Sequence, residues 1–197
     1  MVSMATYSAM NGLFSGGAII AAERATGWVR QLRVAGLSGP AYLTTKAGIS
    51  YLTALPGLLV VFLLAHLTRH VDLSAGRWLV TALAILLGLV PVVALGVLVG
   101  YSIHPNSLQP LLGLGSALLA LFGGIFVPAE QFPRWLQDLV QALPTYWSAR
   151  SGRAALLGGW VGWHGLAVLV AWTVGLGLLA ARAYRRDSLR PSAAGTS

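Results

Sequence analysis

Long apolar runs alternate with short polar segments along most of the chain. Five of these runs approach the roughly 20 predominantly apolar residues that a helix needs to cross about 30 Å of hydrocarbon. They cover residues 1–22, 47–67, 78–101, 108–127 and 160–181. Pro56 and Pro91 lie inside the second and third runs. This pattern predicts an all-α polytopic membrane protein with five transmembrane helices and no separate soluble domain.

Small side chains are frequent in the first expected span. Gly12 and Gly16 lie four residues apart there, and Gly96 and Gly100 repeat this spacing in the third span. Small residues at this spacing let two membrane helices approach each other closely. Because the chain contains 24 glycines, we interpret the spacing as a sign of helix packing and of no further function.

The segment 128–144 has a different periodicity. Its apolar side chains recur at i, i+3, i+4 and i+7, and polar side chains take the other face, which is typical of an amphipathic helix. Because it is too short to span, we expect a helix over 130–143 that lies in the outer membrane interface. Two interpretations stay open, a packing lid between two spans or part of an outer gate. The candidate gate residues are Pro128, Phe132, Trp135, Leu136, Leu139 and Pro144.

The loop 23–46 between the first two spans holds one glutamate, three arginines and one lysine. Trp28 and Leu32 form a short apolar stripe on it, beside a cationic face. A charged, partly amphipathic segment between two spans is a place where a soluble partner could act on a membrane domain. The alternative is an ordinary cytoplasmic anchor with Trp28 at the membrane interface.

Composition supports a membrane protein and sets its orientation. The chain is 56% hydrophobic and only 9% charged, whereas about 25% charged residues is usual for a soluble domain. The net charge of +8 does not indicate nucleic-acid binding, because the basic residues lie at the ends of apolar runs. With loop 23–46 placed in the cytoplasm, the basic tail 182–197 is also inside. Eight basic residues then lie inside and five outside, in agreement with the positive-inside rule.

Catalytic and metal chemistry find little support in the sequence. The chain has no cysteine, its four histidines are scattered, and no phosphate-binding loop of the GxxxxGK[ST] type is present. Ser116 and His164 could suggest an intramembrane protease, but the residues around them do not form a nucleophile motif. We therefore expect no enzyme activity, metal or cofactor on this chain. If transport is driven by ATP, another chain binds the nucleotide.

Two groups of residues, in their order and spacing, resemble a known family. The first is a small-residue span followed by Glu23-Arg24, Gly27, Leu32, Pro40, Ala41-Tyr42-Leu43 and Lys46. The second is Gly123 to Pro128, then Phe132-Pro133, Trp135-Leu136 and Leu143 to Tyr146. Over nearly its whole length the chain resembles the permease subunit of bacterial ABC-2 type transporters, daunorubicin-type drug exporters among them.

The resemblance implies a six-span half-transporter in the bacterial cytoplasmic membrane that pairs with a second permease copy. A separate ATP-binding subunit, carrying ATP and Mg²⁺, would drive each copy. The family's cytoplasmic coupling helix maps onto Glu23, Arg24, Gly27, Trp28, Arg30, Leu32 and Arg33. The start of the chain resembles the interior of the family's second span, so we expect the family's first span to be missing from this sequence.

The expected function is therefore export by alternating access. The cargo would be drug-like, lipid-like or glycan, and the expected partners are the ATP-binding subunit, the second permease and membrane lipid. The alternative is a small membrane protein that does not transport, such as an assembly or immunity factor.

Overall fold

The computed structural model describes residues 1–34, 36, 38–69 and 73–188, and these form helices without any strand. This confirms the all-α class for the described residues. The helices are α1 (Val2–Ala25), α2 (Trp28–Val34), α3 (Gly39–Arg69), α4 (Ala75–Gly88), α5 (Val90–Ser102), α6 (Pro105–Phe122), the 3-10 turn η1 (Ala129–Gln131), α7 (Arg134–Gln141), α8 (Pro144–Leu156) and α9 (Gly162–Ser188).

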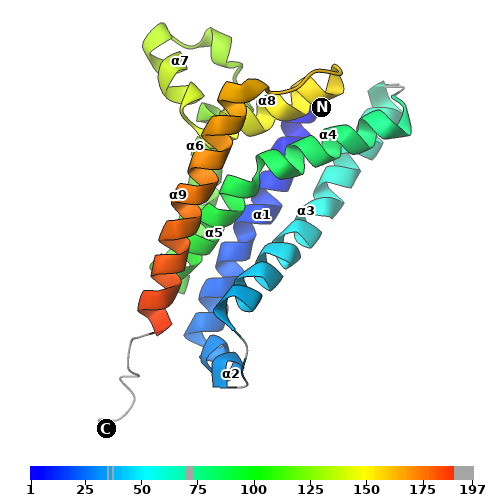
Figure 1. Ribbon diagram of the computed structural model, residues 1–197. Helices are drawn as coiled ribbons and strands as arrows, with labels where there is room; N and C mark the ends of the chain where they lie inside the picture. The colour runs from blue at the N-terminus through cyan, green and yellow to red at the C-terminus, as the bar shows by residue number, and fades with distance from the viewer. Residues whose placement is uncertain (35, 37, 70–72, 189–197) are drawn as a thin grey trace.

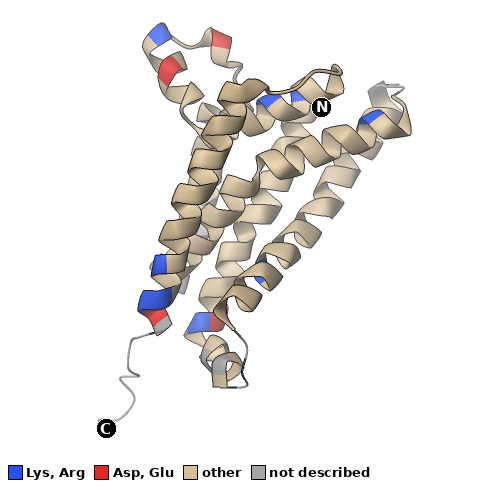
Figure 2. Cartoon of the chain, in the orientation of Figure 1, with Lys and Arg blue, Asp and Glu red and all other residues tan. Residues whose placement is uncertain are grey.

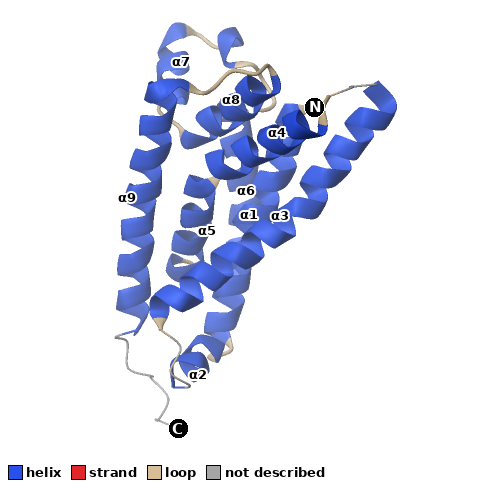
Figure 3. Ribbon diagram, turned by 45° about the vertical axis from the view of Figure 1, so that its right-hand side comes forward, coloured by secondary structure: helices blue, strands red, loops and turns tan. Residues whose placement is uncertain are grey.

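The long helices run side by side as a bundle with α1 near its middle (Figures 1 and 3). One end of the bundle carries α2 and the last turns of α9, and we call it the α2 end. The opposite end carries α7 and α8, and we call it the α7 end. Loop 23–46 and the start of the expected tail thus lie at the same end, as the orientation inferred from the basic residues requires. The part of the tail 182–197 that follows Ser188 lies outside the described residues.

Glycines let α1 touch both of its main neighbours. A Cβ atom on Gly12 would lie 2.7 Å from the Cα of Ala54 in α3. A Cβ on Gly17 would lie 2.4 Å from the carbonyl oxygen of Gly96 in α5, and one on Gly100 would lie 2.6 Å from the carbonyl of Gly17. All three distances are too short for a side chain, so Gly12 and Gly100 are confirmed as packing positions, and Gly17 is a further one that the spacing did not single out.

Three helical stretches among the described residues are long and apolar enough to cross a membrane. They are residues Gly39–Thr68 of α3, Ala75–Ser102 of α4 and α5 together, and Gly162–Asp187 of α9. The expected spans 1–22 and 108–127 correspond to α1 and α6, which are not among the three. The apolar part of α6, Pro110–Phe122, is shorter, and 13 residues at 1.5 Å each reach only about 20 Å.

The expected span 78–101 is not one continuous helix. It divides at Leu89, whose φ of −90° and ψ of 4° lie outside the helical region, and α5 begins with Pro91 in its first turn. Proline has no N–H to donate, and its ring clashes with the preceding turn, so a helix tends to break just before it. Pro56, in contrast, lies inside α3 without ending it.

Helix α8 was not predicted from the sequence, which offered only a loop between Pro144 and the last span. Apart from Tyr146, Trp147 and Leu156, its residues are small or polar, yet most of the helix is buried. It lies across the α7 end and packs mainly on α4 (Figure 1). Ser148 donates a hydrogen bond to the carbonyl of Gly88, 2.5 Å away, and Ser151 donates to the carbonyl of Ala84 at 3.0 Å. Hydroxyl groups therefore hold α8 against the end of α4.

Candidate functional site at the α2 end

A tight turn joins α1 to α2. The N–H of Gly27 donates to the carbonyl of Arg24 at 3.1 Å, and the N–H of Gln31 donates back to Gly27 at 3.3 Å. Gly27 has a φ of 74°, a left-handed conformation that glycine adopts without a steric cost. Only two residues, Thr26 and Gly27, separate the helices, so a displacement of α2 is passed directly to the end of α1.

One face of α2 packs on the bundle and another is exposed. Val29 is buried and Leu32 is half-buried against a cluster formed by Ile20, Tyr42, Val97, Tyr101 and Ala180. Trp28 is 48% exposed and Val34 is 85% exposed. Of the two apolar residues expected to meet a partner, Trp28 is therefore accessible, whereas Leu32 attaches α2 to its own bundle. The side chains of Arg30 and Arg33 lie outside the described structure.

Arg24, in the last turn of α1, reaches two other helices. Its Nη1 donates to the carbonyl of Gly100 in α5 at 2.8 Å. Its Nη2 and Nε donate to the Oδ1 of Asp187 in α9, at 2.5 and 3.2 Å. The guanidinium carbon also lies 5.2 Å from the ring centre of Tyr101, within the range of a cation–π contact.

Glu23 makes the corresponding contacts to α3. Its Oε2 accepts a hydrogen bond from the hydroxyl of Tyr42 at 2.7 Å. Its Oε1 accepts one from the ammonium group of Lys46. Each carboxylate oxygen therefore has a donor, and Lys46 also lies 5.4 Å from the ring centre of Tyr42.

These contacts form a unit, the charge clamp, consisting of Glu23, Arg24, Tyr42, Lys46 and Asp187. It joins α1 to α3, α5 and α9 at the α2 end, where Figure 2 shows acidic and basic residues at the ends of neighbouring helices. The side chains of both ion pairs are mostly buried, with exposures of 12% to 22%. Losing one partner of such a pair leaves a poorly solvated charge, so the clamp resists separation of the helices.

Sequence reasoning did not find Asp187. The chain contains only five acidic residues, and Asp187 lies in the arginine-rich end of α9, next to Arg185 and Arg186. A single carboxylate within a basic segment was a signal that it has a specific partner. Its pairing with Arg24, 163 residues away in sequence, depends on the fold.

The outer helix is shorter than predicted, and only part of its apolar face packs on the bundle. The range 130–143 contains the turn η1, extended residues at Phe132 and Pro133, and then α7. Leu136 and Val140 of α7 pack with Phe132 on α8 and α9. Trp135 is 70% exposed and Leu139 is 55% exposed, so these two form a separate apolar stripe that no described helix covers.

The remaining candidate gate residues, Pro128 and Pro144, lie on either side of α7. Pro128 is exposed just before η1. Pro144 is buried in the first turn of α8, so it starts the next helix instead of only ending the outer one.

The two residues considered for catalysis, Ser116 and His164, make contacts that serve helix structure and packing. Ser116 is buried in α6 and donates to the carbonyl of Gly113 at 3.0 Å, within its own helix. The ring of His164 packs against Trp147 with centres 5.4 Å apart. Among the described residues, no group of three or more acidic, histidine or cysteine side chains is arranged to hold a metal.

Comparison with known proteins agrees with this architecture. The family model described as "ABC-2 type transporter" matches residues 1–157. The Bacillus subtilis (strain 168) protein YvfS, which is named as a transport permease, is 29% identical over 174 residues. That alignment covers 87% of this chain and 71% of the relative. The chain is a helical bundle with several apolar spans, and the family model matches it over most of its length. It therefore belongs to the ABC-2 type transporter family and is a multi-pass permease of the cytoplasmic membrane.

Proposed function

We propose that this permease exports its cargo with energy supplied by a separate ATP-binding subunit that docks on α2. The observation that carries the proposal is the position of Trp28, which is exposed four residues after Arg24 of the charge clamp. An exposed aromatic side chain is a frequent anchor of protein interfaces. The clamp lies directly behind it and joins four helices. A push on α2 would therefore reach α1, α3, α5 and α9 together.

In this proposal the α2 end faces the cytoplasm and the chain crosses the membrane five times. The crossing helices are α1, α3, the α4–α5 pair, α6 and α9. Basic residues support this orientation, because Arg24, Lys46, Arg182, Arg185 and Arg186 all lie at the α2 end. ATP and Mg²⁺ would bind to the partner subunit.

A second permease copy would complete the transport path. The outer face of α6 carries a row of exposed leucines at helical spacing, Leu111, Leu114, Leu118 and Leu121. Such a row is apolar enough to meet either lipid or another helix. We propose that alternating access takes place where two copies meet, and that an amphipathic or lipid-like cargo fits best. Drug-like molecules and glycans are the other two cargo classes that we propose.

The test is association with an ATP-binding-cassette subunit that is produced together with this chain. Truncating a buried aromatic anchor often costs about 2 kcal/mol, which is roughly thirty-fold in affinity. We therefore expect Trp28→Ala to weaken co-purification by about that factor and to uncouple ATP hydrolysis from export, with membrane insertion unchanged. Leu32 is a poor choice for this test because it packs on the bundle.

Trp135→Ala is the control, since Trp135 is also an exposed tryptophan, 70% against 48%, and lies at the opposite end. It should leave association unchanged. Normal association and transport in Trp28→Ala would show that α2 is only a membrane anchor and that the ATP-binding subunit does not dock on it. Export that continues when the ATP-binding protein is deleted would overturn the energy source itself.

A further inference from the structure

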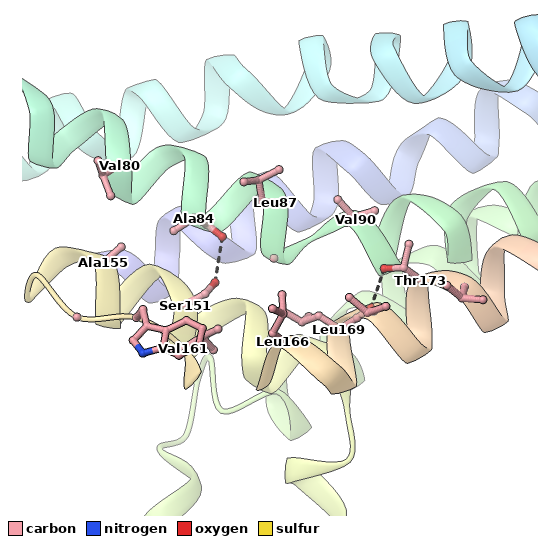
Figure 4. A pocket seen from close by; sticks show the side chains of 15 residues that line it. Val80, Ala84, Leu87, Val90, Ser151, Ala155, Val161, Leu166, Leu169 and Thr173 are labelled. Carbon is pink, nitrogen blue, oxygen red and sulfur yellow. Dashed lines mark hydrogen bonds between the residues drawn. The ribbon is translucent and has the colours of Figure 1, made fainter. Parts of the chain in front are cut away.

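An apolar cleft of about 490 Å³ lies between α4, α8 and α9, near the α7 end. Figure 4 shows its walls, with Val80, Ala84 and Leu87 on the α4 side and Leu166 and Leu169 on the α9 side. The two hydroxyl groups in the walls are already used within the protein. Ser151 donates to the carbonyl of Ala84, and Thr173 donates to the carbonyl of Leu169 at 2.7 Å. The cleft therefore offers a ligand almost entirely hydrocarbon contacts.

The cleft is long enough to hold an acyl chain from one leaflet of a bilayer. Its α9 wall runs from Val161 to Val174, which corresponds to about 20 Å along a helix at 1.5 Å per residue. One leaflet contributes about half of the roughly 30 Å hydrocarbon thickness. Val80, Val170 and Val174 line the cleft and are each more than half exposed. The cleft is therefore open on the outer side of the bundle, beside the first half of the candidate span Gly162–Asp187.

Aromatic and cationic groups mark the end of the cleft nearest the membrane surface. Trp160 lines the cleft and packs edge-on against Trp163, with ring centres 5.0 Å apart, and tryptophans favour the level of the headgroups. The Nη2 atom of Arg77 lies 3.6 Å from the position that a Cβ on Gly158 would occupy, one residue before the rim at Gly159. Arg77 is exposed, and its guanidinium makes no hydrogen bond or ion pair with the described residues.

We propose that this cleft is a phospholipid-binding site. One acyl chain fills the space between α4 and α9, and the headgroup phosphate binds to the guanidinium of Arg77. The lipid belongs to the leaflet at the α7 end. The cleft suits both parts of a phospholipid, because the acyl chain contacts aliphatic walls and the phosphate contacts the cationic side chain near their end. Arginine binds phosphate through strong charge-assisted hydrogen bonds.

The test uses the full chain, purified in detergent and freed of lipid, with dipalmitoyl phosphatidylglycerol as the probe. Native mass spectrometry measures the occupancy of the first bound lipid. Val170→Trp fills the cleft from α9 and should abolish the tightest adduct. Val60→Trp is the matched control, because Val60 is a valine of α3 exposed to the same extent, 54% against 52%, and lies outside the cleft. If Val170→Trp does not fold, as judged by circular dichroism, Val80→Trp replaces it from the opposite wall.

Arg77→Gln tests the headgroup contact. Hydrogen bonds to charged groups are worth about 1.5 kcal/mol or more, so phosphatidylglycerol binding should fall about tenfold. Binding of dipalmitoyl glycerol, which has the same tails without the phosphate, should not change. Arg134→Gln, at another exposed arginine of the α7 end, is the control.

Two results would overturn the proposal. Equal lipid binding in Val170→Trp and Val60→Trp would mean that lipid only coats the surface. A photoreactive residue at position 170 should attach to lipid in membranes. Attachment to a second copy of the chain would make the cleft a protein interface instead.

Discussion

The two ends of the bundle hold their helices together by different chemistry. At the α2 end, ion pairs from Glu23 and Arg24 cross to α3 and α9. At the α7 end, neutral hydroxyl groups of Ser148 and Ser151 bind carbonyls of α4, and aromatic rings of Tyr146 and Trp147 fill the space beside α9. Charged contacts join helices through long side chains, whereas the serine contacts bring backbones close together.

This difference suggests a division of roles. Long charged side chains keep their contact while helices shift slightly, because they can follow the movement. Serine-to-carbonyl bonds require close and nearly fixed helix positions. The α2 end is therefore suited to receive a movement from α2, and the α4–α8 contact at the α7 end is suited to remain rigid.

The largest expected effect comes from the centre of the clamp. Arg24→Leu removes the ion pair with Asp187 and the donor to the carbonyl of Gly100. Breaking a buried ion pair from one side costs about 3 kcal/mol or more. Thermal unfolding in detergent should show a marked loss of stability. Arg186→Leu, which changes an exposed arginine near the same helix end, should lower the stability only slightly. Equal losses in the two variants would mean that the clamp has no special importance.

The second prediction separates charge from hydrogen bonding on the α3 side. Glu23→Gln keeps an acceptor for Tyr42 but removes the charge that pairs with Lys46. Tyr42→Phe removes only the hydroxyl. We expect Glu23→Gln to cost about 2 kcal/mol, as for a hydrogen bond to a charged group, and Tyr42→Phe to cost about 1 kcal/mol. Chemical denaturation measures both, and the reverse order would contradict a clamp based on charge.

At the α7 end, Ser148→Ala removes the donor to the carbonyl of Gly88. Leaving a buried carbonyl without that donor should cost about 1 to 2 kcal/mol. Ser15→Ala is the control, because Ser15 is exposed and bonds only within its own helix. If transport fell while stability stayed the same, the α4–α8 contact would have a role beyond rigidity.

The smallest effect is expected on the exposed stripe of α7. Trp135→Cys and Leu139→Cys should change stability by no more than about 0.5 kcal/mol, as is usual for surface positions. Both cysteines should react with an impermeant thiol reagent added from outside. Leu136→Cys should react slowly, because Leu136 packs on the bundle. Fast labelling at position 136 alone would contradict the described orientation of α7.

Much of the helical architecture could be predicted from the sequence, because hydrophobicity over about 20 residues is a local property. The spans around Pro56 and in α9, and the close approach at Gly12 and Gly100, follow from such local patterns. Helix α8 could not be found in this way. Its burial depends on small side chains that fit against α4, and this fit is visible only in three dimensions.

The candidate site was predicted only in part. A loop with Glu23, Arg24 and Trp28 indicated a place for a partner, because it combines charged and apolar side chains between two apolar spans. The inward packing of Leu32 and the pairing of Arg24 with Asp187 depend on how α9 returns to the end of α1. Contacts between residues so distant in sequence leave no periodic signal.

The break at Leu89 gives the third expected span the properties of a joint. On one side of the break, α4 is bound to α8, and on the other side α5 packs on α1 and α9. At an ordinary point of a helix, bending would break backbone hydrogen bonds. Here proline has already removed one donor, and Ser148 supplies another to the carbonyl of Gly88. Bending at this point therefore breaks fewer backbone hydrogen bonds than it would inside a regular helix, which favours Leu89 as the place where α5 changes its angle to α4.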